Sequence, residues 1–369
     1  ILELIQKNSP ISKSEIAGNL GLSPTSVSNF INELTAQNKI IKCGTAKSTG
    51  GRKSALYQIN PQAFYVIGLD LQVDRIITVL TNSVGNAIAT SEDFFQNKDE
   101  WRVIPLLNDN IRRIAKENNI APERIGGIGI GVPGIVHSKS RVVEFAPNLG
   151  WQNVNLQQLL NIDKPIIIEN EANAAALGEK AFGVAGAVTN FIYVSIGIGV
   201  GCGLITNGRL FTGHSYYAGE FGHMTIEPSG LTCRCGNQGC WEVYISNEAA
   251  LKLYNQISQR KIHNYEEFLD LVFKEDQYAM EVLESNIRYL GIGIANLVNG
   301  LNPDMVIIGG KIVEARELIY PKLLRQIKER SLDKTFGGFT LEFSRLKNQT
   351  TAMGMASLVI DQLMTAENF

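Results

Sequence analysis

The sequence predicts an α/β protein in two parts: a small, mostly helical head at residues 1–60 and a larger body made of two similar halves. Two observations lead to this prediction. Capped helical segments follow one another between residues 1 and 36. In the body, a group of three strands joined by short turns occurs at 66–90 and again at 191–211. With 369 residues, of which 44% are hydrophobic and 19% charged, the chain can bury a core in each part.

The charge is unevenly distributed along the chain. Residues 1–60 hold seven basic and three acidic side chains, a net charge of +4, so the remainder carries −6 within the total of −2. This excludes a protein that binds nucleic acid along its whole length, but it permits a head that binds DNA. Residues 181–208 are uncharged, yet seven of these 28 are glycine, which favours buried strands and turns over a membrane span. We expect a cytoplasmic protein without membrane contact.

Three short helices are predicted in the head. The first has an apolar face within Ile1–Ile5 and ends at Asn8-Ser-Pro10. The pattern Ser12-Lys-Ser-Glu15 is a capping box that begins the second helix, and Gly21 supplies the turn after it. Ser23-Pro24 places an N-cap residue before a proline at the first helical position, so the third helix begins there.

The third helix has two different faces. Its apolar side chains are expected to point inward: Val27, Phe30, Ile31 and Leu34. Short hydroxyl and amide side chains point outward: Thr25, Ser26, Ser28, Asn29 and Asn32. An outer face with no acidic side chain before Glu33 can enter the major groove of DNA, where Ser26, Ser28 and Asn29 would reach base edges.

A hairpin follows the three helices. Ile40–Cys43 and Ala55–Ile59 are its predicted strands, and the glycine-bearing stretch between them would form a wing. Basic side chains lie at or beside its tip: Lys47, Arg52 and Lys53. We expect the two lysines to contact phosphates and Arg52 to enter the minor groove. The alternative is an ordinary three-helix unit with solvated lysines, which the basic head on an acidic chain disfavours.

The body starts near Pro61 and contains the repeated strand group. The first copy is predicted at Val66–Leu71, Ile76–Thr81 and Ala87–Thr90, and the second at Phe191–Ile196, Val200–Thr206 and Arg209–Phe211. Further buried strands are expected at Ile125–Gly131, Pro165–Glu169 and Met305–Gly309. Two related lobes that face each other imply a cleft between them, where small ligands usually bind.

Three motifs give the chain a family resemblance. They are Glu220-Phe-Gly-His223 with Cys233-Arg-Cys235-Gly-Asn-Gln-Gly-Cys240-Trp-Glu242, Gly131-Val-Pro-Gly134, and Glu169-Asn-Glu-Ala-Asn-Ala174. Through them the whole chain resembles the ROK family of repressors, open reading frames and sugar kinases. The resemblance implies a two-lobed actin/hexokinase-like body, a duplicated ribonuclease H-like fold, after a winged helix-turn-helix. The Gly-Gly-Arg wing resembles the repressor branch, and within it 169–174 and 222–244 are most similar to bacterial xylose repressors.

The expected domain boundaries follow from this organisation. The winged helix-turn-helix occupies 1–60 and the first lobe 61–182, and the second lobe, with the cysteine motif, occupies 183–350. The C-terminal helix at 351–369 is expected to pack on the first lobe.

One imidazole and three thiolates within eighteen residues indicate a metal site: His223, Cys233, Cys235 and Cys240. Four such ligands with no open position are typical of a closed, tetrahedral, structural Zn²⁺ site. Buried thiols beside an unrelated histidine are the alternative, which this spacing disfavours. Three of the five cysteines crowd into this motif, which indicates a reducing compartment. The other two are expected to be small buried side chains: Cys43 and Cys202.

A sugar site is predicted where a buried strand meets the alanine-rich helix at 172–182. The resemblance assigns Asn170 and Glu171 there to sugar hydroxyls. The helix dipole favours an ionised Glu171, and simple helix capping is the alternative role. The resemblance also places Glu220, His223 and Glu242 on the other side of the sugar. Asn148, in the stretch Pro147-Asn-Leu-Gly-Trp151, is a further candidate. A zinc-bound His223 would donate to the sugar through its second ring nitrogen.

Two departures from the kinases of the family argue against catalysis. Glu171 stands where their aspartate base is expected, and its extra methylene moves the carboxylate by about 1.5 Å, enough to cost roughly 100-fold in rate. The turn Asp70-Leu-Gln-Val-Asp74 lacks the glycines that would bring backbone N–H groups to phosphate. We therefore expect no catalytic residues, although glycines remain at 197–203 and 309–310.

The sequence thus predicts a sugar-responsive repressor, a homodimer or homotetramer bound to palindromic double-stranded operator DNA. Xylose or a related sugar would bind the cleft and release the DNA. There are two alternatives. One is an active sugar kinase with a DNA-binding head, and the other is a repressor that another protein sequesters. The sequence leaves open which sugar acts, whether it induces or co-represses, and which operator is bound.

Overall fold

The computed structural model describes residues 1–46, 54–138 and 140–365. The head contains α1 (Leu2–Asn8), α2 (Lys13–Leu20) and α3 (Pro24–Ala36). A three-stranded antiparallel sheet in the order β1-β3-β2 completes it, with β1 at Ile11–Ser12, β2 at Ile40–Thr45 and β3 at Ala55–Ile59.

Local signals determine where the helices of the head begin. The Ser12 side chain accepts from the N–H of Glu15, whose carboxylate accepts from the N–H of Ser12, so the predicted capping box is confirmed. Ser23 caps α3 by accepting from the N–H of Ser26, with Pro24 at the first helical position, as predicted. Gly21 ends α2 in the left-handed conformation.

Two expectations about the head are wrong. Phe30 is 46% exposed, because only the strip of α3 that carries Val27 and Ile31 is fully buried. Cys43 is exposed, since β2 has left the core at that point and carries a bulge between Lys42 and Gly44. Cys202 is buried, as expected.

The first lobe is built on a five-stranded sheet in the order β11-β7-β4-β5-β6. Its strands are β4 (Tyr65–Leu71), β5 (Arg75–Asn82), β6 (Ala87–Phe94), β7 (Ile125–Val132) and β11 (Ile166–Asn170). The sheet packs against α4 (Glu100–Glu117), which precedes the short η1 (Pro122–Arg124). A small antiparallel sheet adjoins it, formed by β8 (Ile135–His137), β9 (Val142–Ala146) and β10 (Trp151–Asn155), followed by α5 (Leu156–Leu159).

The second lobe repeats this topology. Its sheet has the order β14-β13-β12-β15-β16, with β12 (Phe191–Ile196), β13 (Val200–Thr206), β14 (Arg209–Leu210), β15 (Met305–Gly310) and β16 (Thr340–Phe343). Each sheet is an antiparallel meander extended by two parallel strands. The predicted duplication is therefore confirmed. The third strand of the first copy extends to Phe94, four residues beyond the predicted end.

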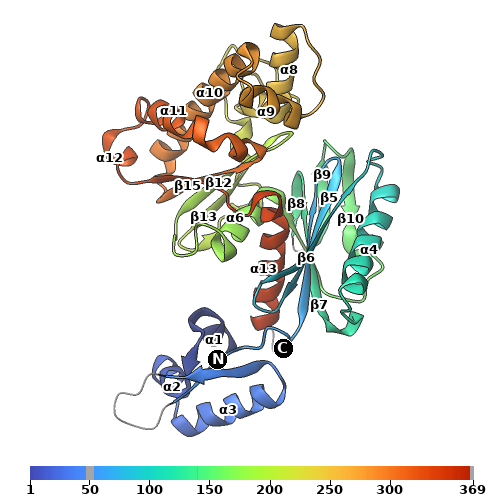
Figure 1. The fold of residues 1–369 in the computed structure, drawn as a ribbon, viewed down its shortest axis with the longest axis vertical. Coiled ribbons are helices and arrows are strands. Elements are labelled where there is room, and N and C mark those ends of the chain that lie inside the picture. The colour runs from blue at the N-terminus through green and yellow to red at the C-terminus, as the bar shows by residue number, and fades with distance from the viewer. Residues whose placement is uncertain (47–53, 139, 366–369) are drawn as a thin grey trace.

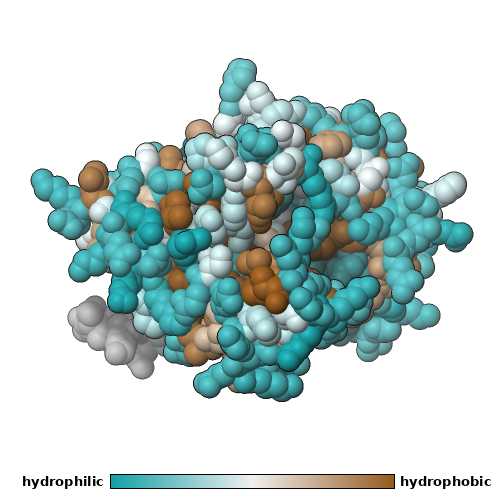
Figure 2. Space-filling view, turned by 90° about the horizontal axis from the view of Figure 1, so that it is seen from above, coloured by the Kyte–Doolittle hydropathy of each residue, from teal (hydrophilic) through white to brown (hydrophobic). Residues whose placement is uncertain are grey.

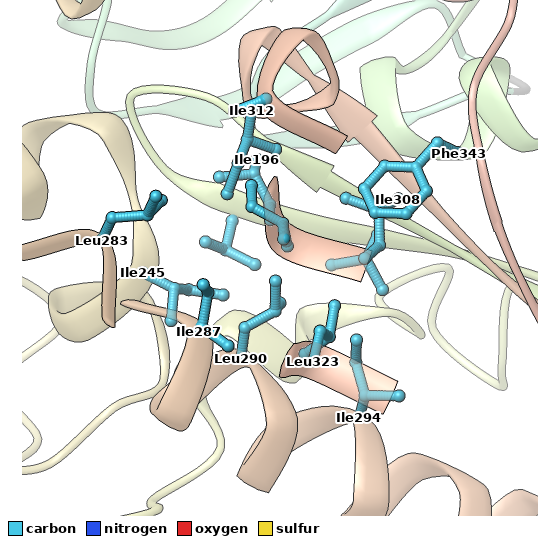
Figure 3. Close-up of a cluster of buried hydrophobic side chains, with 14 of the residues drawn as sticks. Ile196, Ile245, Leu283, Ile287, Leu290, Ile294, Ile308, Ile312, Leu323 and Phe343 are labelled. Atoms are coloured by element: carbon cyan, nitrogen blue, oxygen red, sulfur yellow. The ribbon is translucent and has the colours of Figure 1, made fainter. Parts of the chain in front are cut away.

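Helices cover one face of the second sheet (Figure 1). They are α8 (Asn247–Ser258), α9 (Tyr265–Phe273), α10 (Gln277–Leu301), α11 (Arg316–Lys328) and α12 (Asp333–Phe336). Figure 3 shows the core between these helices and the sheet, where Ile196 and Ile308 from the strands meet Leu290 and Ile294 from α10. Shorter segments complete this lobe: η2 (Glu220–His223), α7 (Glu242–Ile245), η3 (Lys311–Ala315) and η4 (Lys347–Gln349).

Two helices cross between the lobes, α6 (Glu171–Phe182) and α13 (Thr350–Thr365). They approach so closely that a Cβ on Gly354 would overlap the carbonyl oxygen of Ala174, and one on Gly178 would overlap that of Thr350. Glycine at both positions therefore permits contact between the two helix backbones.

The long helix α13 also reaches the head (Figure 1). Buried Ile5 of α1 belongs to the same hydrophobic cluster as Val359, Ile360 and Met364 of α13. Gln6 Nε2 donates to Asp361 Oδ1 at 3.0 Å, so α1 rests on the end of α13.

In the described part of the chain, no helix is long and apolar enough to cross a membrane. Seen from above the lobes, the surface is mostly hydrophilic, with hydrophobic residues in separate patches (Figure 2).

Candidate functional site

A pocket lies between the two lobes, and about 330 Å³ in and around it is free of protein atoms, a volume that includes open solvent at its mouth. Its walls come from 134–136 around the start of β8, from Asn170 and Asn173 at the start of α6, from 201–202 of β13, and from 216–220. Both lobes therefore contribute to it.

Asn170 is fixed as the N-cap residue of α6. Its Oδ1 accepts from the N–H groups of Ala172 and Asn173 at 2.8 and 3.2 Å. Its Nδ2 donates to the carbonyl oxygen of Gly134 at 2.9 Å and to Glu171 Oε2 at 3.3 Å. Capping thus occupies the amide oxygen of Asn170, and the amide nitrogen lies on the pocket side beside Gly134.

Glu169 supports this arrangement from behind. Its Oε1 accepts from the N–H of Asn170 at 2.9 Å and from Asn173 Nδ2 at 3.1 Å, and its Oε2 accepts from Ser138 Oγ at 2.9 Å. Asn173 lines the pocket although the sequence analysis missed it. Its spacing of three residues from Asn170 places it on the same helix face, a signal that could have revealed it.

Glu171 lies directly behind the pocket wall, next to Asn170 and facing Gly201. Burial is the main cause that raises its pKa to about 8, and the negative charges of Asp70 and Glu220 raise it further. The expectation that the helix dipole keeps Glu171 ionised is therefore wrong, because desolvation outweighs the dipole. The same effect of burial raises the pKa of Asp70, which is 4% exposed, to about 7.

These two carboxyl groups make stability depend on pH. A raised pKa means that the folded chain binds protons more tightly than the unfolded chain, so stability falls as pH rises from the ordinary carboxyl pKa toward 8. We expect the melting temperature of the ligand-free protein to fall by a few degrees between about pH 5 and pH 8. Asp70→Asn with Glu171→Gln should flatten this slope in a calorimetric pH series. An equal slope in the double variant would contradict the assignment.

The other predicted sugar-site residues occupy different places. Glu220 lines the pocket. Next to it, His223 Nε2 lies 3.9 Å from Glu220 Oε2. Glu242 is outside the lining, where its Oε2 accepts from the N–H of Val200 at 3.0 Å. Asn148 is also outside, where its Oδ1 accepts from Arg234 Nη1 at 3.2 Å.

The four predicted metal ligands come together. Their ligand atoms, from His223, Cys233, Cys235 and Cys240, all lie within 4.8 Å of one another. Cys235 Sγ is 3.6 Å from Cys240 Sγ, and Cys233 Sγ is 3.7 Å from His223 Nδ1. Sulfur atoms of a tetrahedral zinc site with bonds of about 2.3 Å lie about 3.8 Å apart, so these residues fit the ion.

Glycines shape the loop that carries the cysteines. Gly236 and Gly239 have φ values of +92° and +71°, and a Cβ on Gly239 would overlap the carbonyl oxygen of Glu227. The Cys233 N–H donates to Asn237 O at 2.8 Å, and Cys240 pairs with Thr225 in an isolated bridge. The loop thereby turns back and brings Cys240 to the other ligands.

The turn between β4 and β5 uses its polar groups in hydrogen bonds and an ion pair within the turn. Gln72 Nε2 donates to Asp70 Oδ2 at 2.6 Å, and the Gln72 N–H donates to Arg75 O at 2.9 Å. Arg75 pairs with Asp74 at 3.0 Å, and Val73 is buried. The backbone donor of Gln72 is thus used within the turn, which carries two acidic side chains.

The outer face of α3 is accessible, as predicted. Thr25, Asn29 and Asn32 are exposed, and Ser26 and Ser28 are partly exposed. Residues Lys47, Arg52 and Lys53 lie outside the described residues. The structure adds Lys13, which the sequence analysis missed. Its Nζ donates to Ser28 Oγ at 2.9 Å and to Asn32 Oδ1 at 3.4 Å, so it stands beside the polar face of α3.

Comparison with known proteins agrees with this architecture. Residues 66–362 match the ROK family, and residues 1–41 match the winged helix-turn-helix DNA-binding domain. The xylose repressor of Bacillus spizizenii is 35% identical over 366 residues, covering 99% of this chain and 94% of the repressor. That of Caldicellulosiruptor bescii is 38% identical over 383 residues, covering 99% and 95%.

A solved structure extends the likeness to three dimensions. A ROK family transcriptional regulator, a homolog of the E. coli MLC protein, superposes with a TM-score of 0.84 at 26% identity, covering 98% of this chain and 94% of the regulator. The chain belongs to the ROK family.

Proposed function

We propose that this protein is a sugar-responsive transcriptional repressor that binds operator DNA through its head and releases it when a sugar enters the interlobe pocket. The observation that carries the proposal is the position of α13, which contacts the pocket helix α6 near its start and the head near its end. The xylose repressors among the relatives support xylose or a related sugar as the effector.

Contacts at both ends of α13 support coupling between pocket and head. At one end, Thr351 Oγ1 donates to the carbonyl oxygen of Glu171 at 3.2 Å. At the other, Asp361 accepts from Gln6 of α1. Packed helices move as bodies and do not deform continuously, so a ligand that displaces α6 displaces the head through α13. The protein has one arrangement of its heads that binds DNA and one that does not. To release DNA, the sugar must bind the second arrangement more tightly than the first.

The proposal assigns residues as follows. Residues 1–60 form the DNA-binding domain, 61–182 with α13 the first lobe, and 183–350 the second lobe. The pocket binds sugar hydroxyls through Asn170, Glu171, Asn173 and Glu220, and His223 and Glu242 stand beside them. A structural Zn²⁺ bound by His223 and the three clustered cysteines would hold the loop at 233–240. A homodimer or homotetramer would present two heads to a palindromic operator.

We further propose that the protein has no kinase activity. The closed turn at Asp70–Asp74 supports this, because the Gln72 N–H is used within the turn and the turn lacks the glycines that would bring backbone N–H groups to a phosphate.

A fluorescence-anisotropy titration tests the proposal. Labelled DNA from upstream of the chain's own gene is titrated at fixed salt, with and without xylose, glucose and N-acetylglucosamine. We expect tight binding that one of these sugars weakens at least about tenfold. Binding that no sugar changes would favour release by a protein partner, and sugar-dependent ATP consumption would favour the kinase.

Lys13 should contact a DNA phosphate, because it stands beside the polar face of α3. Lys13→Ala is expected to weaken operator and non-operator DNA alike and to lower the slope of log Kd against log salt by about one. Lys116→Ala, on α4 of the body, is the matched control. A change in operator preference with an unchanged salt slope would contradict a phosphate contact.

A further inference from the structure

The segment Phe211–Gly219 joins β14 to η2 and forms one side of the pocket. Four of its residues, 216–219, line the cavity. The opposite side belongs to the first lobe, where residues 134–136 lead into the small sheet of β8, β9 and β10. This segment and that sheet therefore face each other across the pocket.

The segment is tied together near its base and contains two glycines, Gly213 and Gly219. The N–H of Ala218 donates to Thr212 O at 3.1 Å and closes the neck of the loop. Gly213 and Gly219 have φ values of +72° and +107°. Gly213 can act as a hinge, because glycine turns about its backbone where other residues are restricted. Gly219 anchors the other end to β13, since its carbonyl oxygen accepts from the Cys202 N–H at 3.2 Å and a Cβ there would overlap the carbonyl oxygen of Cys202.

Two tyrosines extend from this loop to the first lobe. The ring of Tyr216 lies 5.5 Å from the ring of His137 on β8, measured between centroids and tilted by 55°. Tyr217 Oη donates to Glu144 Oε2 on β9 at 2.6 Å, and this bond raises the pKa of Tyr217. Both contacts join the two lobes across the pocket.

The backbone of Tyr216 is strained. Its φ of +67° lies in the left-handed region, which is costly for an aromatic residue without a local reason. Such conformations persist where the surroundings enforce them. Here the conformation presents successive side chains, Tyr216 and Tyr217, to successive strands of the first lobe.

We propose that Phe211–Gly219 is a flap that closes the pocket, and that Tyr217 is the positioning residue that holds it shut by its bond to Glu144. The inference rests on the proposed function for the identity of the ligand. A sugar can then leave after this bond breaks and the flap turns on the hinge at Gly213, while Gly219 stays anchored to β13, so the flap determines how long the sugar stays bound.

The variant Tyr217→Phe tests this, because it removes one hydroxyl and keeps the ring. We expect sugar to dissociate about two- to fivefold faster, the loss of one solvent-exposed hydrogen bond to a carboxylate, while operator affinity without sugar stays the same. Glu144→Ala should have the same effect, and the double variant should add little to either single change. Tyr320→Phe, on α11, is the matched control.

Hydrogen exchange of the 212–219 amides in the ligand-free protein gives a second readout that requires no sugar. Tyr217→Phe should raise their exchange rates, while those of β12 stay unchanged. Equal exchange in parent and Tyr217→Phe, or additive effects of Tyr217→Phe and Glu144→Ala, would overturn the flap. If the parent binds none of xylose, glucose and N-acetylglucosamine, the proposed function fails, and hydrogen exchange still decides whether the flap exists.

Discussion

Glu171→Ala should abolish the response to sugar and leave operator binding intact. The Glu171 carboxyl lies beside Asn170 at the pocket wall, and its pKa of about 8 keeps it mostly protonated at neutral pH. It can then both donate to and accept from sugar hydroxyls. Removing it should weaken sugar binding by about 10- to 100-fold, as measured by calorimetry, with unchanged anisotropy of the DNA complex without sugar.

Glu171→Gln separates the charge of this side chain from its hydrogen bonding. An amide resembles a protonated carboxyl in shape and in offering a donor and an acceptor, so this variant should retain much of the sugar affinity. Glu281→Ala, on the surface of α10, serves as the control. If the sugar concentrations that release the parent protein from DNA also release the Glu171→Ala variant, Glu171 has no part in the site. If Glu171→Gln fails as completely as Glu171→Ala, the sugar requires an ionised carboxylate.

Cys235→Ser should remove about one zinc ion per chain and destabilise the second lobe by several kcal/mol, because binding of a structural metal contributes directly to folding. Cys235 is exposed, so the substitution leaves no cavity and the loss arises from the metal. Metal analysis of the purified protein together with thermal unfolding measures both effects.

Cys43→Ser is the matched control for the metal prediction. Cys43 is exposed on β2, away from the ligand cluster, so its removal should change neither zinc content nor melting temperature. A parent protein that contains no zinc after purification without chelators would end the metal assignment.

The parts of the fold that local signals determine were predictable from the sequence. The capping box at Ser12–Glu15 and the Ser23-Pro24 pair each fix a helix start within four residues, independently of the rest of the molecule. The doubled strand group was equally visible, because buried strands such as β12 are continuous apolar runs. Phe30 was wrongly predicted to point into the core. Helical periodicity shows on which side of a helix a residue lies, but it does not show how much of that side the rest of the head covers.

The candidate site was predictable where its members are close in sequence or belong to motifs that carry the family resemblance. The four metal ligands span eighteen residues, so their spacing grouped them, whereas Asn170 and Glu171 were assigned to the sugar site by the family resemblance. The raised pKa of Glu171 depends on Asp70 and Glu220, which the folded chain brings near it from distant segments. Likewise, Tyr217 meets Glu144 across 73 positions, and no periodic pattern marks the loop that carries it.

Under the proposed coupling, α13 would turn where its backbone meets that of α6, at Gly178 and Gly354, and its far end would move the head. From Gly354 to Thr365 the helix rises about 16 Å, at about 1.5 Å per residue. A rotation of about 10° at the crossing would carry its end about 3 Å sideways, and α3, which lies beyond that end, farther still (Figure 1). In the proposed dimer the displacements of the two heads combine. The half-sites of an operator lie about 34–36 Å apart, and the major groove is about 12 Å wide. A small turn at the two glycines would therefore move both recognition helices out of register with the major grooves of the two half-sites.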